Sequence, residues 1–307
     1  LRQIVMTKVG ILLPTRESVF YGDQRGDPRP LVELAVQAEE LGFDSVWAGD
    51  SLLARPRAEP LTLLAGVATQ TKTVSIGTAV LLPSMRNAEL LAQSTATLDA
   101  LSGGRFILGI GGGPGTPGVR FDHELVGADF VRRASTSVAV AERVKSLWRG
   151  TGDHQMYPLT HTEDGPPIWM GGDGPRTLDR TGRLFDGWFP LSTSPEAFSY
   201  GLRKVKESAT NAGRQPKDID AAAYLTIVIG DPEEAQPQLA EHAELYYGVP
   251  FSQISQMQGS FAGHKDAVVD WLRGFVDAGV EHLCIRFGCN DPAGQLELLA
   301  ELRSEIA

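Results

Sequence analysis

The chain has 307 residues, of which 42% are hydrophobic and 21% charged, with a formal net charge of −10. This is the composition of a globular protein with a large core, and the acidic charge disfavours nucleic acid or an anionic membrane as the main partner. Two cysteines, Cys284 and Cys289, are too few for a disulfide scaffold or a four-ligand zinc site. No apolar stretch could span a bilayer and no signal-peptide pattern is present, so we expect a cytoplasmic protein.

Short β-rich runs alternate with amphipathic helical segments along the chain. Strands are expected at Val9–Leu13, Ser45–Ala48, Val74–Leu82, Phe106–Ile110, Ile168–Met170, Gly187–Pro190, Ala221–Ile229 and His282–Phe287. Helices are expected near Pro30–Leu41, Leu61–Thr69, Glu89–Leu101, Val131–Trp148, from Pro175 onward, Glu196–Ala212, Glu233–Tyr247, Asp266–Ala278 and Gly294–Ile306. Alternation of this kind implies a parallel sheet, and eight units predict the α/β fold of a single (β/α)8 TIM barrel.

One domain is expected to cover residues 1–307, because no Pro/Ser-rich linker divides the chain. Two stretches, Gly111–Asp129 and Gly248–Gly263, look irregular and are interpreted as extra loops at the C-terminal face of the strands. Active sites of such barrels lie at that face, so the strand ends are the places where functional residues are expected.

The second strand runs into Asp50 and Ser51, at the expected barrel mouth. A carboxylate beside a hydroxyl can transfer a proton or orient a ligand, which makes both residues catalytic candidates. The alternative is that one of them caps the following turn. Arg55 and Arg57 lie just beyond and could bind a carboxylate or sulfonate, or could be solvated surface arginines.

The segment Gly171–Arg176 forms a glycine turn between the fifth strand and a helix that Pro175 is expected to start. Arg176 would then lie in the first helical turn, where the helix dipole disfavours a cation unless an anion binds beside it. One interpretation is therefore a phosphate site. The other is a plain connection in which Asp173 caps the helix and Arg176 points to solvent.

Glycines also follow the fourth strand, in the run LGIGGGPGTPG. Its match to a dinucleotide-binding fingerprint is weak, because Pro114 and Pro117 interrupt the segment where the helix of that motif would have to begin. No histidine pair has metal-ligand spacing, so no catalytic metal is expected.

Several segments together resemble the bacterial luciferase-like superfamily. They are LGFDSVWAGDSLL, VSIGTAVLLP, ATLDALSGGRFILGIGGG, PPIWMGGDGPRTLDRTGRLFDGWFP and the C-terminal DAGVEHLCIRF. Members of that family are TIM barrels that bind FMN or the deazaflavin F420 at the C-terminal mouth. The resemblance therefore implies one of these two cofactors here, and it also favours a homodimer.

The resemblance further implies which residues hold the cofactor. Ala79 and Val80 match a non-prolyl cis peptide in a bulge that supports the flavin ring, and Gly111 and Gly112 match positions that line the cleft. The phosphate is implied to bind at Gly171, Gly172, Asp173, Gly174 and Arg176. Under this interpretation Arg55 and Arg57 could also meet the acidic tail of F420, and Trp47 and Phe121 could form walls of the substrate site or be ordinary packing residues.

One position departs from the family pattern. Many F420-dependent members carry Asp-His where this chain has Asp50-Ser51. A serine cannot act as an acid–base group near neutral pH as histidine does. The leading interpretation is therefore a monooxygenase that uses reduced FMN and molecular oxygen on a small organic substrate. The alternatives are an F420-dependent hydride-transfer reductase or dehydrogenase, and a non-catalytic flavin-binding protein. Since nothing resembles an internal NAD(P)H site, a separate flavin reductase is the expected partner of an FMN enzyme.

Overall fold

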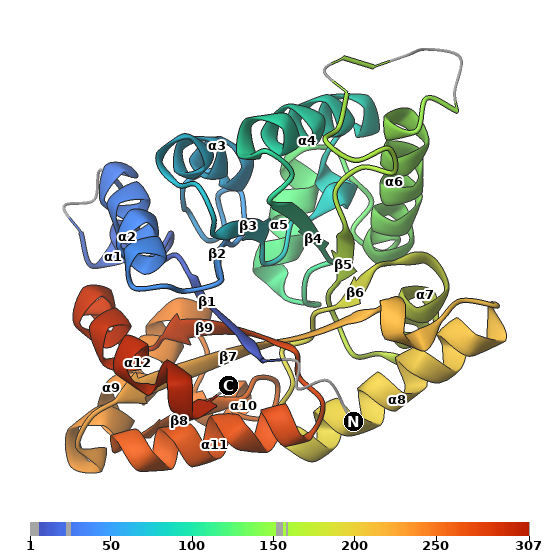
Figure 1. The fold of residues 1–307 in the computed structure, drawn as a ribbon. Coiled ribbons are helices and arrows are strands. Elements are labelled where there is room, and N and C mark those ends of the chain that lie inside the picture. The colour runs from blue at the N-terminus through green and yellow to red at the C-terminus, as the bar shows by residue number, and fades with distance from the viewer. Residues whose placement is uncertain (1–5, 23–25, 152–155, 158, 307) are drawn as a thin grey trace.

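The computed structural model describes residues 6–22, 26–151, 156–157 and 159–306. Within these ranges, parallel strands form a closed ring in the order β1-β2-β3-β4-β5-β6-β7-β9, with β9 paired to β1 and helices around the outside (Figure 1). The strands are β1 (Lys8–Leu12), β2 (Ser45–Ala48), β3 (Ser75–Thr78), β4 (Phe106–Ile110), β5 (Ile168–Met170), β6 (Gly187–Trp188), β7 (Asp220–Ile229) and β9 (His282–Phe287). The predicted TIM barrel is confirmed.

Each of the expected long helices is present within a few residues of its predicted bounds. Local signals explain where several begin, because Asn87 and Ser194 each accept a hydrogen bond from a backbone N–H in the first turn of their helices. The helices are α2 (Arg29–Glu40), α3 (Pro60–Gln70), α4 (Ala88–Ser102), α6 (Arg133–Trp148), α7 (Pro175–Leu184), α8 (Pro195–Asn211), α9 (Pro232–Tyr247), α11 (Lys265–Asp277) and α12 (Pro292–Ile306). None of the helices in the described ranges combines the length and apolar character that a membrane crossing needs.

The two stretches interpreted as irregular contain regular structure, so that expectation was wrong. The first holds α5 (Pro117–Leu125), because Pro117 occupies the first helical turn after the cap Thr116 rather than interrupting a helix. The second holds α10 (Phe251–Ile254) and the strand β8 (Ser260–Gly263). A further short helix, α1 (Glu17–Phe20), follows β1 and was not expected.

Strand β8 exists because β7 is longer than its neighbour in the ring. β6 pairs only with the start of β7, at Asp220 and Ala221, while β9 runs along its other edge. The far half of β7 is therefore open on the β6 side, and β8 pairs there with Thr226–Ile229. The ring keeps the predicted number of strands, with β8 as an addition at its C-terminal end.

The third strand is shorter than predicted. It ends at Thr78 instead of Leu82, and the peptide bond between Ala79 and Val80, just after the strand, is cis. Pairing resumes only at the bridge between Leu81 and Ile110 of β4. The cis bond implied by the family resemblance is thus confirmed.

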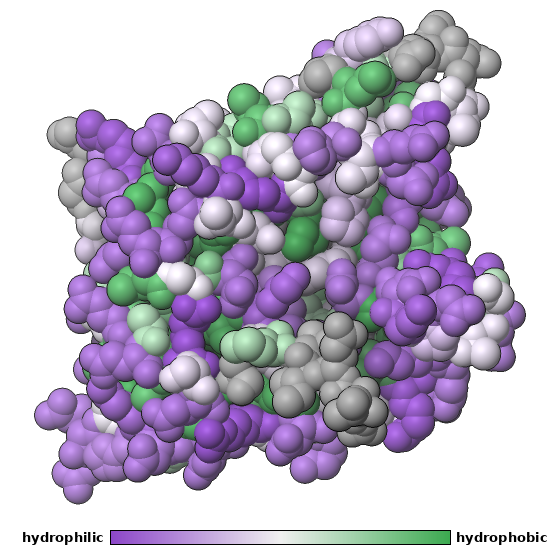
Figure 2. Space-filling view, viewed as in Figure 1, coloured by the Kyte–Doolittle hydropathy of each residue, from purple (hydrophilic) through white to green (hydrophobic). Residues whose placement is uncertain are grey.

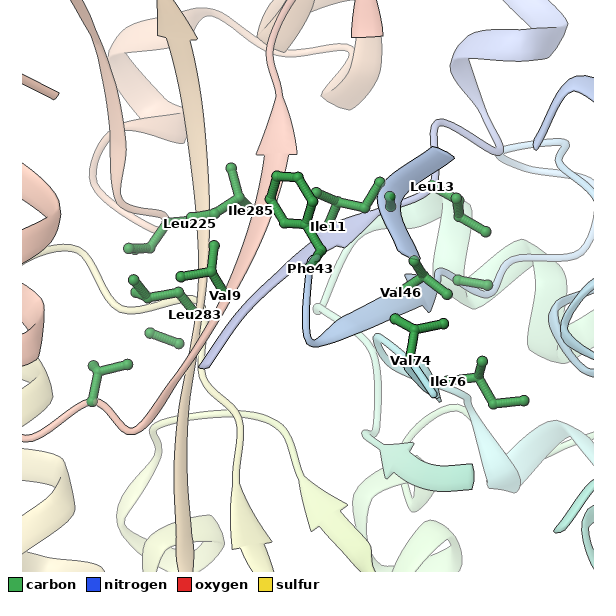
Figure 3. Close-up of a cluster of buried hydrophobic side chains, with 14 of the residues drawn as sticks. Val9, Ile11, Leu13, Phe43, Val46, Val74, Ile76, Leu225, Leu283 and Ile285 are labelled. Carbon is green, nitrogen blue, oxygen red and sulfur yellow. The ribbon is translucent and has the colours of Figure 1, made fainter. Parts of the chain in front are cut away.

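Side chains of the strands divide between two apolar layers. One lies between the ring and the surrounding helices, and Figure 3 shows part of it, with Val9, Ile11, Val46, Ile76, Leu283 and Ile285 among its members. The other fills the inside of the ring and includes Leu12, Trp47, Trp169, Phe189, Ala222, Tyr224 and Cys284. By contrast, the surface seen in Figure 2 is mainly hydrophilic.

Room for the Trp47 ring comes from the neighbouring strand. A Cβ on Gly77 of β3 would lie only 2.3 Å from the ring of Trp47. The indole itself is 0% exposed, and its ring centroid lies 5.2 Å from that of Trp169 and 4.9 Å from that of Phe189. The inside of the barrel below the mouth is therefore filled by aromatic side chains rather than open.

The carboxylate of Glu39 makes a pH-dependent contribution to the stability of the fold. Glu39 on α2 accepts hydrogen bonds from the backbone N–H groups of Lys72, Thr73 and Val74. Burial raises the pKa of Glu39, but these donors outweigh it and lower that pKa to about 2. Since the folded-state pKa is below the unfolded value, the stabilisation is present at neutral pH and is lost as pH falls through the window from about 4.5 to about 2.

We therefore expect Glu39→Gln to unfold at lower urea concentration than the wild type at pH 7, with the difference shrinking as the pH falls below about 4.5. Urea unfolding followed at a series of pH values measures this. The matched control is Glu33→Gln, an exposed glutamate on the same helix. Parallel curves for wild type and Glu39→Gln across the whole range would contradict the assignment.

Candidate functional site

Ala79 and Val80, joined by the cis peptide bond and called the cis bulge below, meet two glycines at the C-terminal ends of β3, β4 and β5. The Gly111 N–H donates to the Leu81 carbonyl at 2.9 Å, and the Gly171 N–H donates to the Ile110 carbonyl at 2.8 Å. A Cβ on Gly111 would lie 2.7 Å from Val80 Cγ2, and one on Gly171 would lie 3.2 Å from Val80 Cγ1. Three residues predicted from separate segments, Val80, Gly111 and Gly171, are thus brought together at the barrel mouth.

The turn after β5 is open to solvent. Gly172 has φ +108°, a backbone conformation that favours glycine, and its carbonyl accepts a hydrogen bond from Trp188 Nε1 at 2.8 Å. Gly174, Pro175 and Arg176 are exposed, so α7 presents its N-terminal end to solvent. A helix end of this kind, with unpaired N–H groups and the positive end of the dipole, is suited to an anion.

The alternative in which Asp173 caps α7 does not hold. The N-cap residue is Gly174, and no side chain makes a capping hydrogen bond there. Asp173 is exposed in the turn before it. Gly112 lies next to the mouth but faces α6, since a Cβ on it would be 3.1 Å from Ala134 Cα.

Asp50, predicted as a catalytic carboxylate, is already fully engaged. Its two oxygens accept hydrogen bonds from Arg86 Nη1 at 2.6 Å and Nη2 at 2.9 Å, and one of them also accepts from the Leu82 N–H at 2.9 Å. The Asp50 side chain is only 2% exposed. In this arrangement Asp50 ties the end of β2 to the segment after the cis bulge.

Ser51 is held in a similar way by a helix that the sequence did not reveal. Its hydroxyl donates to Asp122 Oδ2 of α5 at 2.9 Å. The same carboxylate accepts the backbone N–H groups of Leu52, Leu53 and Ala54. Burial raises the pKa of Asp122, but these donors outweigh it and lower that pKa below its usual range. Ser51 thus belongs to an anchor for the β2–α3 loop.

The two aromatic candidates for substrate walls lie in different places. Trp47 is fully buried inside the ring, which favours the packing alternative for it. Phe121 lies on α5 and is 47% exposed. The structure does not bring these two side chains to a common surface at the mouth.

Arg55 and Arg57 lie at the mouth, where they join two further arginines around a tyrosine pair. Tyr246 and Tyr247 end α9. The guanidinium carbons of Arg16, Arg57 and Arg286 lie 5.0, 5.6 and 4.2 Å from the centroid of the Tyr246 ring. That of Arg55 lies 5.4 Å from the Tyr247 ring, whose backbone carbonyl accepts a hydrogen bond from Arg55 Nη2 at 3.3 Å. These four arginines are called the arginine cluster below.

The arginine cluster adjoins the cis bulge through Gly49. A Cβ on Gly49, directly after β2, would lie 2.3 Å from Arg57 Nη1 and 3.7 Å from the Ala79 carbonyl oxygen. The absence of a side chain at Gly49 thus lets the Arg57 guanidinium reach the mouth beside the bulge. Burial raises the pKa of the Tyr246 hydroxyl, but the charges of Arg57 and Arg286 outweigh it and lower that pKa.

Sequence reasoning missed Arg286, Arg16 and the two tyrosines. One signal was available for Arg286, because a charged residue interrupts the otherwise apolar end of the strand HLCIRF. Lys and Arg are seldom fully buried without a reason, so that residue qualified as a functional candidate. No comparable local signal existed for Arg16 or Tyr246, which lie in a loop and at a helix end.

Comparison with known proteins shows a match to the model of the luciferase-like monooxygenase family over residues 7–271. The 5,10-methylenetetrahydromethanopterin reductase of Methanolobus tindarius is 31% identical over 207 residues, which cover 65% of this chain and 61% of the relative. The F420-dependent glucose-6-phosphate dehydrogenase of Amycolatopsis mediterranei is 30% identical over 297 residues, which cover 83% of this chain and 87% of the relative. The chain thus spans less than two thirds of the first of these relatives.

Solved structures share the fold. An F420-dependent secondary alcohol dehydrogenase in complex with an F420-acetone adduct superposes with a TM-score of 0.81 at 21% identity, covering 98% of this chain and 99% of the other. The oxygenating constituent of 3,6-diketocamphane monooxygenase from Pseudomonas putida, in complex with FMN, gives a TM-score of 0.77 at 17% identity, covering 98% of each chain. Because the family model covers most of its length, the chain belongs to the luciferase-like monooxygenase family.

Proposed function

We propose that this protein is an oxidoreductase that binds F420 at the barrel mouth and transfers a hydride between F420 and a small organic substrate. The observation that carries the proposal is the meeting of Val80, Gly111 and Gly171 beside the open end of α7. Val80 already fills the space that a Cβ on either glycine would need, so the bulge can pack against both strand ends only because these residues have no side chain. The packed surface beside the open end of α7 would support the flat ring of a flavin or deazaflavin.

In this proposal the cis bulge and Gly111 support the ring, and the turn Gly171–Arg176 holds the phosphate. Backbone N–H groups at the start of α7 and the Arg176 guanidinium would bind the phosphate oxygens. When bound, F420 supplies or accepts the hydride. The protein contributes orientation and a protected mouth, and the Tyr246 hydroxyl, with its pKa lowered by neighbouring arginines, would hold the proton that accompanies reduction of a polar double bond.

The choice of F420 over FMN rests on the relatives rather than on the mouth itself. One relative, whose match covers 83% of this chain, is named an F420-dependent glucose-6-phosphate dehydrogenase. The engagement of Asp50 by Arg86 adds a reason to look for the proton donor elsewhere, because that carboxylate has no free oxygen for the role.

The second candidate is a monooxygenase that uses reduced FMN and molecular oxygen, the leading interpretation of the sequence. The description of the family model and the serine at position 51 favour it. In that case a separate flavin reductase is the proposed partner. A homodimer is proposed for either candidate, on the family resemblance.

The deciding experiment is an anaerobic fluorescence titration of the purified protein with F420, FMN and reduced FMN. Tight binding of F420 with little response to either FMN form supports hydride transfer and justifies a screen of alcohols, carbonyl compounds and imines for F420 turnover. Preference for reduced FMN, with substrate-dependent oxygen uptake, would replace the first candidate by the second. Binding of F420 or FMN without turnover of any substrate class would indicate a flavin-binding protein. If neither F420 nor either form of FMN binds, the proposal of a cofactor site at the mouth is wrong.

Replacing Arg176 by alanine tests whether the turn Gly171–Arg176, called the phosphate turn below, binds the cofactor phosphate. We expect the dissociation constant of the cofactor to rise about tenfold, because a charge-assisted hydrogen bond to phosphate is lost. Arg183→Ala, in the last turn of the same helix, is the matched control and should leave affinity unchanged. Equal affinities for wild type and Arg176→Ala would show that the phosphate binds elsewhere.

A further inference from the structure

The arginine cluster gathers four positively charged side chains at the mouth. Within the described part of the chain, none of its members lies within ion-pair distance of a carboxylate. The buried carboxylate near the cluster, Glu17, lies 3.3 Å from His242 Nε2. The crowding of positive charge is reflected in the pKa of Arg16, which burial and the neighbouring charges of Arg55 and Arg57 lower to about 10. This concentration of charge stands out in a chain of net charge −10.

Arg286 is the deepest member and has spare hydrogen-bonding capacity. It projects into the ring from β9, on the same face as Cys284, and is 1% exposed. Its Nη1 contacts the Tyr247 hydroxyl at 3.3 Å and its Nη2 contacts Gln258 Oε1 at 3.4 Å, both long for charged donors. Its Nε–H has no hydrogen-bond partner. A buried N–H group without a hydrogen-bond partner is destabilising, and a ligand oxygen that accepts from it would remove that cost.

The position of the cluster relates it to the substrate rather than to the cofactor phosphate. Its members come from β9 and from the segments after β1 and β2, and β1 stands opposite β5 in the ring order. The phosphate turn follows β5, on the other side of the mouth. Both Arg57 Nη1 and the Ala79 carbonyl oxygen lie within 4 Å of the position that a Cβ on Gly49 would take. An anion bound to Arg57 would therefore lie beside the cis bulge.

We propose that the arginine cluster binds an oxyanionic group of the substrate, such as a carboxylate, through Arg57 and Arg286. The inference rests on the proposed function, since it assigns the substrate class of that same mouth. Planar guanidinium groups match the two oxygens of a carboxylate, and the rings of Tyr246 and Tyr247 screen the contact from water. The anionic end would hold the substrate with its reacting carbon towards the bulge.

The test measures thermal unfolding of the full chain without cofactor, with sodium formate or formamide added at constant ionic strength. Formate is small enough to enter whatever the shape of the true substrate, and formamide has its size without its charge. We expect formate, and not formamide, to raise the unfolding midpoint of the wild type. In Arg57→Gln the same rise should need about tenfold more formate or be absent. Arg143→Gln, an exposed arginine on α6, is the matched control and should respond as wild type.

Three outcomes overturn the inference. One is an equal response of the wild type to formate and formamide, and another is an unchanged formate response in Arg57→Gln. The third is a loss of F420 affinity in Arg57→Gln as large as its loss of formate response, which would assign the cluster to the acidic tail of F420. The proposed function is judged separately: a formate response without binding of F420 or FMN would leave the anion site standing and remove the cofactor.

Discussion

Replacing Gly111 by alanine is expected to weaken F420 or FMN binding by about tenfold or more. The new Cβ would lie 2.7 Å from Val80 Cγ2, closer than such atoms approach, so the bulge has to shift. Because Val80 also packs against Gly171, the displacement would reach the start of the phosphate turn. A flat ring that needs the bulge in place then loses its support. Cofactor titration of wild type and variant measures the effect.

The matched control for this change is Gly66→Ala on α3. A Cβ there would meet only Val32 Cγ2 at 3.5 Å, an ordinary contact, and alanine favours a helix over glycine. We expect this variant to bind the cofactor as wild type does. If Gly111→Ala remains folded and binds with unchanged affinity, the ring does not lie on the bulge and the site has to be sought elsewhere at the mouth.

Replacing Arg86 by methionine is expected to lower the free energy of unfolding by about 3 kcal/mol. The change leaves the Asp50 carboxylate, which is 2% exposed, with only the Leu82 N–H as a partner. An uncompensated buried charge of this kind is costly, whereas an exposed ion pair contributes little. Urea unfolding at pH 7 measures the loss.

Arg143→Met is the control for this prediction, because Arg143 pairs with Glu89 on the surface and both side chains are about half exposed. Its loss should stay below about 1 kcal/mol. Similar losses for the two variants would mean that solvent reaches Asp50 and that its pairing with Arg86 does not hold the strand ends together. In that event proton transfer by Asp50 would gain support.

The candidate site divides into parts that could and could not be predicted. The glycine turn after β5 and the glycines after β4 carry their signal locally, since glycine marks places where the backbone turns sharply or is closely approached. The cis bond at Ala79 was reached only through the family resemblance. The hydrogen-bond partners of Asp50 and Ser51 could not be predicted, because Arg86 and Asp122 lie 36 and 71 residues away in the sequence.

The irregular segments show the same division for the fold. The sequence analysis treats Pro117 as a residue that interrupts a helix, whereas Pro117 begins α5. Proline is favoured in the first turn of a helix, so a local rule could have predicted this start. β8 could not be derived in this way. It forms because β7 extends beyond β6 and leaves an open edge, and the length of that edge is known only once the ring is closed.

By itself the sequence determined the order and type of the main elements, since hydrophobic periodicity and helix caps act between residues close in the chain. Closure of those elements into a barrel followed from their alternation. Only the tertiary structure decided which charged groups meet: Arg86 with Asp50, and Arg57 with Arg286 around Tyr246. The physical reason is that electrostatic and hydrogen-bond energies depend on distances of a few ångströms, and for residues far apart in sequence those distances are set by the packing of the whole ring.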